Sequence, residues 1–160
     1  MSSAPKSLKN FNKAVRDFTE ELKRLFGSED NDIQVIEAVI AMLKVTARLI
    51  ITPFQKYVLA NREFVRKITE EDMLFFLNFN YDTMVSKTST YKEYGLGLIS
   101  KFRDALKKFQ SDAETVKGIF AWFKIMIYYA AEDLGLTIEN IVANIDQENE
   151  TSRQKGNSTL

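Results

Sequence analysis

The sequence predicts an all-α protein, a single-domain bundle of about six helices around one apolar helix at about residues 112–134. Apolar residues recur every three or four positions along most of the chain, which is the helical period, and no stretch shows the alternation of a useful β-strand. The stretch from Val116 to Ala131 carries only Lys124 as a charge between Lys117 and Glu132. With 45% hydrophobic residues and 12 Phe, the 160 residues can fill the core of one domain.

The apolar helix is expected to be the central helix of the bundle. A helix that is apolar all round has no face for water and should be enclosed by other elements. Its apolar run is shorter than the about 20 residues of a membrane span, and it ends in Glu132 and Asp133, so we expect no membrane span. Its aromatic residues are typical of a core; stacking on a flat cofactor is the alternative, and we expect no cofactor.

The N-terminal half predicts two long helices. Residues 1–7 are interpreted as a flexible arm, because they contain Pro5 and almost nothing apolar. The first helix begins near Leu8, ends at Gly27 and has a stripe at helical spacing formed by Phe11, Val15, Phe18, Leu22 and Leu25. The second should run from about Asp32 to Ile51, with a kink or break at Pro53.

The middle of the chain predicts shorter elements. A short helix should follow Pro53, and Thr69 should cap the next one, with Glu70, Glu71 and Asp72 in its first turn. The acidic trio could instead hold a metal, but three consecutive helical residues diverge by about 100° each, which favours capping. Residues 78–90 form a predicted loop, and a helix is expected from about Tyr91 to Phe109.

The C-terminal part predicts the central helix and a cover for the bundle. Ser111 and Glu114 match a capping box at its start, and Gly135 is a plausible stop. A short helix containing Ile138 and Ile141 should close the open end, which completes a domain of residues 8–145. Beyond Asp146 no apolar residue occurs before Leu160, so residues 146–160 are expected to be a disordered tail.

The composition argues against most kinds of catalysis. The chain has no cysteine and no histidine, so it lacks thiolate chemistry, Ser-His triads and the commonest metal ligand. Carboxylates, a lysine or a tyrosine would have to act as the catalytic groups. Glu132 with Asp133 is the best acidic pair for such a role. We expect no enzyme and no metal site. Because no signal peptide is visible, we expect an intracellular location and not secretion.

Two kinds of partner remain open. Lysine and arginine together number 22 and balance 22 acidic residues, which argues against a surface devoted to nucleic acid. A local phosphate site is the alternative, if basic sides of the first helix and of the helix after Tyr91 converge; its candidate contacts are Lys9, Lys13, Arg16, Lys101 and Lys108. A protein partner or a homo-oligomer would use an exposed apolar patch, which we expect Tyr57, Tyr91 and Trp122 to border.

The pattern of apolar and turn residues between Phe11 and Ala131 carries a resemblance. It rests on Phe11-Asn12, Phe18, Glu21-Leu22, Phe26, Pro53-Phe54, Tyr57-Val58-Leu59, Glu63-Phe64, Phe120, Trp122, Tyr129 and Ala130. In these residues the chain resembles small, mostly uncharacterised helical proteins encoded by large nucleocytoplasmic DNA viruses. The resemblance implies a viral protein, with carriage in the virion as one option, and brings no enzyme activity. We therefore expect a non-catalytic interaction or structural protein, with a nucleic-acid-associated helper as the alternative.

Overall fold

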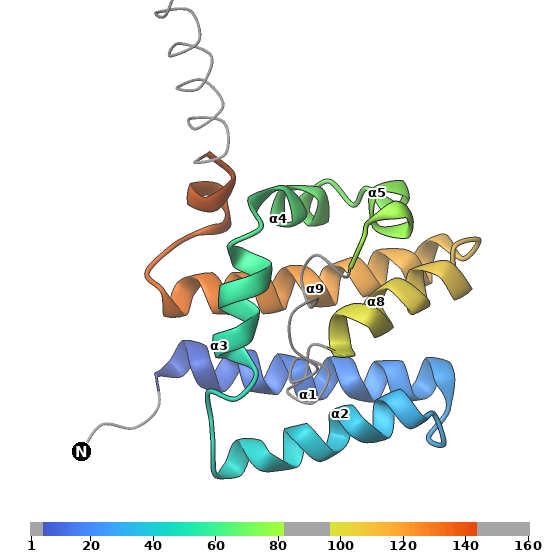
Figure 1. Cartoon of the computed structure of the whole chain (residues 1–160). Helices are drawn as coiled ribbons and strands as arrows, with labels where there is room; N and C mark the ends of the chain where they lie inside the picture. Colours follow the sequence, from blue (N-terminus) through green and yellow to red (C-terminus); the bar gives the residue numbers. More distant parts are fainter. Residues whose placement is uncertain (1–4, 82–96, 144–160) are drawn as a thin grey trace, which may run out of the picture.

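The computed structural model describes residues 5–81 and 97–143, and in these residues the all-α prediction is confirmed (Figure 1). The described segments contain helices and turns and no strand. The predicted arm up to Ala4, most of the predicted loop, Tyr91 and the predicted tail lie outside them. Those predictions therefore stay predictions.

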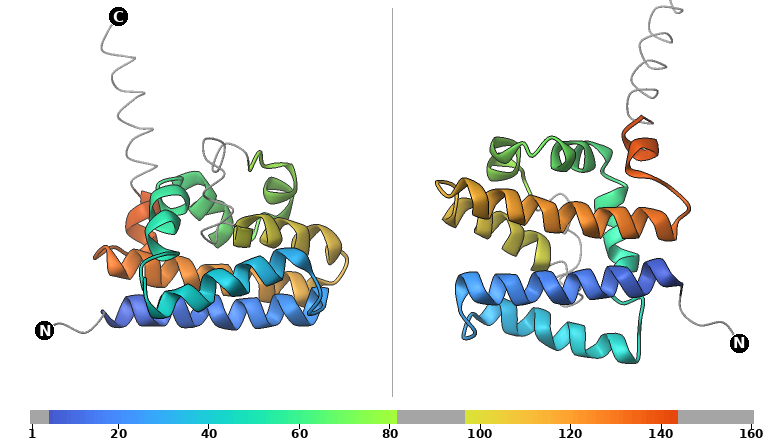
Figure 2. Two further views of the ribbon diagram at one scale, coloured as in Figure 1. Left: turned by 60° about the horizontal axis from the view of Figure 1, so that its bottom comes forward. Right: turned by 180° about the vertical axis from the view of Figure 1, so that it is seen from behind.

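Two antiparallel helices, α1 and α2, form one side of the bundle (Figures 1 and 2). Helix α1 spans Lys6–Phe26 and ends at Gly27, whose φ of 96° suits a residue without a side chain. Helix α2 spans Asn31–Ala41, and the Asp30 side chain caps it by accepting a hydrogen bond from the Ile33 N–H. The first helix thus follows the sequence prediction closely.

The predicted second helix is too long. Helix α2 ends at Ala41, one 3₁₀ turn (η1, Met42–Lys44) follows, and the chain then turns until Ile51. A tertiary contact holds this turn, because Asn12 Nδ2 donates a 2.9 Å hydrogen bond to the Ala47 carbonyl. Pro53 does not break a helix either. It lies in the first turn of α3 (Ile51–Phe54), where proline is tolerated better than in the interior of a helix.

Three short elements then cross to the other side of the bundle: the π-helix η2 (Gln55–Leu59), α4 (Arg62–Thr69) and α5 (Met73–Asn78). The predicted cap at Thr69 is wrong. Thr69 closes α4, Glu71 makes the turn with a φ of 53°, and the Asp72 side chain caps α5 by accepting from the Phe75 N–H. The acidic residues therefore lie in a turn and not in the first turn of a helix.

The last long elements are α8 (Gly97–Lys108) and α9 (Ala113–Asp133). The predicted capping box is wrong by one residue. Asp112 caps α9, since its carboxylate accepts from the Thr115 N–H at 3.2 Å and from the Thr115 hydroxyl at 2.8 Å. Gly135 follows the end of α9 with a φ of 73°, and residues 138–143 are helical, as expected.

Helix α9 contacts α1, α4, α8 and η2, and its inner side carries the aromatic core. The Phe123 ring lies 4.2 Å from that of Phe102, 5.9 Å from that of Phe18 and 6.1 Å from that of Phe54, measured between centroids. The expectation that α9 is enclosed all round is nevertheless wrong. Ile125 is 40% exposed and Tyr128 51% exposed, so α9 has an open apolar side.

Candidate interaction surfaces

The open side of α9 forms a continuous row of apolar or small residues. We define the α9 stripe as Gly118, Ala121, Ile125 and Tyr128, which follow one another at steps of three, four and three residues and are all exposed. Figure 2 (right) shows α9 crossing this side of the molecule with no other helix in front of it. A contiguous apolar row differs from scattered exposed residues, which need no explanation, and it marks a contact surface.

A shallow hollow lies on the C-terminal part of the α9 stripe. It measures about 290 Å³ and is lined by Lys124, Ile125, Tyr128, Tyr129 and Ile138. Leu134 and Leu136, just beyond the end of α9, are also exposed. Of the segment that follows α9, Ile138 takes part in the lining of this hollow.

Packing on both flanks fixes the direction in which the α9 stripe faces. On one flank the Trp122 ring packs against Phe18 of α1, with a centroid distance of 6.4 Å. On the other flank Lys124 Nζ forms a 2.9 Å ion pair with Glu71, in the turn before α5. Between these flanks the described part of the chain leaves the stripe exposed, and Ile138 borders it at its C-terminal end.

A second apolar row runs along the outer side of α2 and η1. We define the α2 stripe as Val35, Ala38, Met42 and Val45, again at steps of three, four and three, with Met42 51% and Val45 91% exposed. The opposite side of α2 buries Ile33, Ile36 and Val39. This surface was not predicted from the sequence, although Val35, Ala38, Met42 and Val45 recur there at helical spacing.

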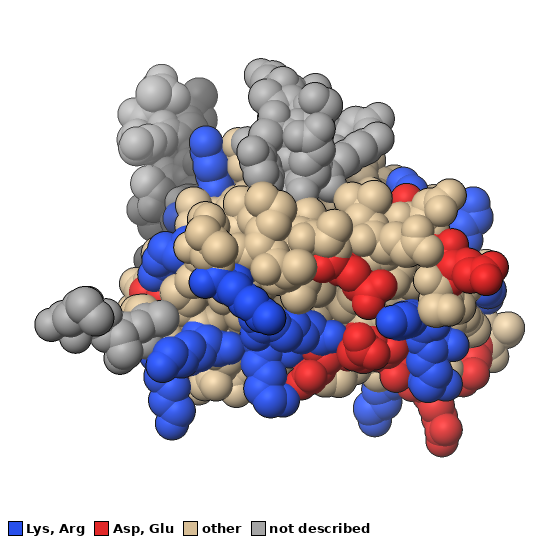
Figure 3. All heavy atoms as spheres, turned by 90° about the horizontal axis from the view of Figure 1, so that it is seen from below, with Lys and Arg blue, Asp and Glu red and all other residues tan. Residues whose placement is uncertain are grey.

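The face of α1 and α2 seen from below separates its charges (Figure 3). The N-terminal half of α1 contributes Lys9, Lys13 and Arg16, all exposed, whereas most acidic side chains lie toward the other end. Because α1 and α2 are antiparallel, Lys44 lies toward the same basic end. Lys13 already pairs with Asp17 at 2.7 Å, which lowers the local positive charge.

The five predicted phosphate contacts do not converge. Lys101 and Lys108 lie against the Phe26 ring, with their Nζ atoms 3.9 Å and 4.8 Å from its centroid. Phe26 ends α1, and at 1.5 Å per residue Arg16 lies about 15 Å and Lys9 about 25 Å away along that helix. The described structure therefore contains a basic end of α1 and a separate basic site on α8, not one stripe.

The predicted protein contacts are also separated. Trp122 is half-buried beside the α9 stripe, so it does border an exposed apolar surface. Tyr57 lies in η2 and is half-buried, with the Lys56 ammonium 5.3 Å from its ring centroid. Tyr91 lies outside the described residues. Of the three, Trp122 is the residue that the structure places next to the α9 stripe.

Lys101 is a buried structural cation and not a surface contact. The residue is only 4% exposed, and its Nζ lies 2.6 Å from an Asp30 carboxylate oxygen and 3.7 Å from one of Asp32. Burial raises the pKa of Asp30, but the hydrogen bonds from Lys101 and from the Ile33 N–H outweigh it, so the pKa lies below its usual value. This ion pair joins α8 to the start of α2.

The predicted acidic pair Glu132 and Asp133 is divided between two environments. The Asp133 side chain is 3% exposed and accepts hydrogen bonds from Arg48 at 2.8 Å and from Gln55 Nε2 at 2.8 Å. Burial raises the pKa of Asp133, but the hydrogen bonds from Arg48 and Gln55 outweigh this effect, so the pKa lies below its usual value. Glu132 is exposed. The ion-paired Asp133 carboxylate joins the end of α9 to the turn after η1 and to η2.

The other acidic residues singled out in the sequence also point to different partners. Glu70 pairs with Arg66 and Lys67, Glu71 with Lys124 and Asp72 with Lys67. No group of three acidic side chains that could hold a metal ion occurs among the described residues. The trio therefore serves ion pairs and the cap of α5.

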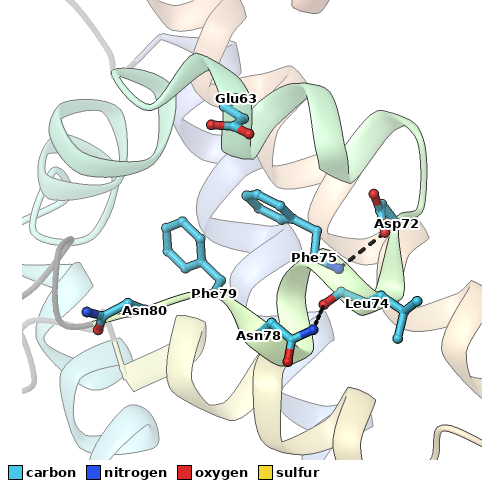
Figure 4. A pocket seen from close by; sticks show the side chains of 7 residues that line it. All are labelled: Glu63, Asp72, Leu74, Phe75, Asn78, Phe79 and Asn80. Carbon is cyan, nitrogen blue, oxygen red and sulfur yellow. Dashed lines mark hydrogen bonds between the residues drawn. The ribbon is translucent and has the colours of Figure 1, made fainter.

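A larger hollow of about 650 Å³ lies between α4 and α5 and is lined by Glu63, Asp72, Leu74, Phe75, Asn78, Phe79 and Asn80. Figure 4 shows the Phe75 and Phe79 rings directed toward α4, where Glu63 lies, and the Asp72 carboxylate bonded to the Phe75 N–H. Carboxylates and phenyl rings suit a cationic group. Lys67 already occupies that role, with its Nζ 3.2 Å from Asp72 and 5.8 Å from the Phe75 ring centroid.

Comparisons with protein-family models, with curated proteins and with solved structures found no match to this chain. In the described residues, no helix combines the length and the apolar character needed to cross a membrane. The surfaces themselves are therefore the basis for a functional proposal.

Proposed function

We propose that this chain is a non-catalytic interaction and structural protein that associates through the exposed apolar sides of its helices. The observation that carries the proposal is the α9 stripe, a row of apolar and small residues on a helix whose other side forms the centre of the core. The α2 stripe supports it, since a chain with two separate apolar faces can contact more than one neighbour, as a structural protein must.

The viral part of the proposal is supported by the sequence resemblance alone. The pattern between Phe11 and Ala131 supports a protein encoded by a large nucleocytoplasmic DNA virus and carried in its virion or acting in the host cytoplasm. Self-association through helix faces would suit such a role, because a structural protein of a particle needs repeated contacts between identical chains.

The test is the molar mass of the purified full chain, measured by light scattering over a wide range of concentrations. The mass of the wild-type chain is expected to rise with concentration, and Tyr128→Glu in the α9 stripe should reduce the rise by placing a charge on the contact surface. Lys13→Glu, an exposed substitution of α1 outside both stripes, is the matched control and should leave the rise unchanged. A wild-type mass that stays at one chain throughout would overturn the proposal.

A nucleic-acid-associated helper is the second candidate, favoured by the basic end of α1 with Lys9, Arg16 and Lys44 (Figure 3). Salt separates the two candidates. Counterion release makes phosphate binding fall steeply with added salt, whereas apolar association does not depend on it in this way. Salt-sensitive binding of a DNA or RNA duplex that is lost in Arg16→Glu, together with a constant molar mass, would favour the helper.

A further inference from the structure

We propose that the partner of the α9 stripe is the α9 stripe of a second copy of this chain, in an antiparallel pair related by a two-fold axis beside Ile125. The inference rests on the proposed function and names its partner and geometry. It is carried by the order of side chains along α9. When two copies of α9 lie antiparallel, the side chains at one end of the stripe face complementary side chains at the other end of the second copy. Three features of that order support it.

The first feature is charge. Lys117 and Glu132 lie at opposite ends of the α9 stripe, both exposed and without an ion-pair partner among the described residues. At 1.5 Å per residue they are about 22 Å apart along the helix. In an antiparallel pair centred midway between them, each Lys117 faces Glu132 of the other copy. One arrangement therefore pairs four charges that have no described partner within the monomer.

The second feature is size. The same axis places Ala121 opposite Tyr128 of the other copy, so that a large side chain meets a small one twice. Near Gly118 the surface is open, because an added Cβ would have no heavy atom of the surroundings within 4 Å. Alternation of large and small residues lets two helices approach closely, which is the condition for good packing of a helix pair.

The third feature is the position of Ile125. It is 40% exposed in the chain, and the axis midway between Lys117 and Glu132 passes beside it. The two Ile125 side chains therefore cover each other at the centre of the contact. A buried apolar centre with charged pairs at the rim is the usual arrangement of a protein interface.

Two other arrangements fit less well. The C-terminal sequence after Ile145 contains no apolar residue before Leu160, so it offers nothing that could cover an apolar surface. A parallel pair of α9 helices would place Lys117 against Lys117 and Glu132 against Glu132, which is unfavourable at both ends. The antiparallel pair is the arrangement that the charges favour.

Single cysteines test the geometry directly, because the chain has none of its own. Under mild oxidation Ile125→Cys should form a covalent dimer, since the two positions meet at the axis. Ala121→Cys is the matched control: the two Ala121 positions lie about 10 Å apart along the pair, beyond the about 7 Å between Cα atoms that a disulfide allows. A parallel pair would cross-link both variants, which would overturn the inference.

A charge exchange gives a second readout that does not depend on cross-linking. Lys117→Glu and Glu132→Lys should each weaken the dimer about tenfold, because each replaces two attractions by two repulsions. The double variant should restore the wild-type dissociation constant, measured by sedimentation. Association that persists without the Ile125→Cys dimer and without this rescue would overturn the inference and leave the proposed function standing. The absence of any association would overturn both.

Discussion

Replacing Phe123 by alanine is expected to lower the free energy of unfolding by about 4 kcal/mol, the largest effect that we predict for truncating a single side chain. The Phe123 side chain is fully buried, and its ring meets aromatic rings from four helices. These rings belong to Phe18, Phe54, Phe64 and Phe102. Because α1, α3, α4 and α8 all contact this one side chain, the vacated space cannot be refilled by the movement of one neighbour.

The free energy of unfolding is measured by chemical denaturation, with circular dichroism as the signal. Ile125→Ala on the same helix is the control. Ile125 lies two positions along, on the open side of α9, so its truncation should cost less than about 1 kcal/mol at concentrations at which the chain is monomeric. Equal losses for the two variants would contradict the division of α9 into a core side and an open side.

Replacing Asp30 by asparagine is expected to lower the free energy of unfolding by about 2–3 kcal/mol, although the two side chains have nearly the same shape. Asparagine caps a helix as well as aspartate does, so the bond to the Ile33 N–H can remain. The charge opposite the buried Lys101 ammonium is lost, however, and the exposed Asp32 at 3.7 Å compensates only in part. The loss of stability therefore measures the contribution of the ion pair separately from that of the helix cap.

Two further variants make this prediction specific. Asp72→Asn changes the cap of α5 in the same way, but its partner Lys67 is 26% exposed in its side chain, so the loss of stability should be clearly smaller than for Asp30→Asn. Adding Lys101→Met to Asp30→Asn should recover stability, since it removes the unpaired buried charge. Equal costs at the two caps, or no recovery in the double variant, would show that the Lys101 pair does not stabilise the fold.

The repeating apolar spacing was enough to predict the helical class and the extent of α1, because such spacing depends only on the local sequence. Helix ends were harder to predict where tertiary contacts decide them. The turn after η1 is held by Asn12 and Arg48, whose partners Ala47 and Asp133 are distant in the sequence. The predicted cap of α9 was Ser111 and the observed cap is Asp112, because adjacent polar residues compete for the same N–H groups.

The candidate surfaces were only partly predictable. An apolar period shows that a side of a helix is apolar, but whether a neighbour covers that side depends on how many helices surround it. The prediction for α9 assumed full enclosure, and Ile125 and Tyr128 show that the bundle leaves one side open. Lys101 illustrates the converse, since a lysine in a basic stretch was expected at the surface and lies buried against Asp30.

The most direct test of the account compares Ile125→Glu with Ile127→Glu, two substitutions on one turn of α9. Ile127 is fully buried, whereas Ile125 is 40% exposed. We predict that Ile127→Glu unfolds the chain and that Ile125→Glu keeps the helical circular dichroism spectrum but remains a monomer at concentrations at which the wild type associates. An Ile125→Glu variant that unfolds, or that folds and associates as the wild type does, would contradict an open, interacting side of α9.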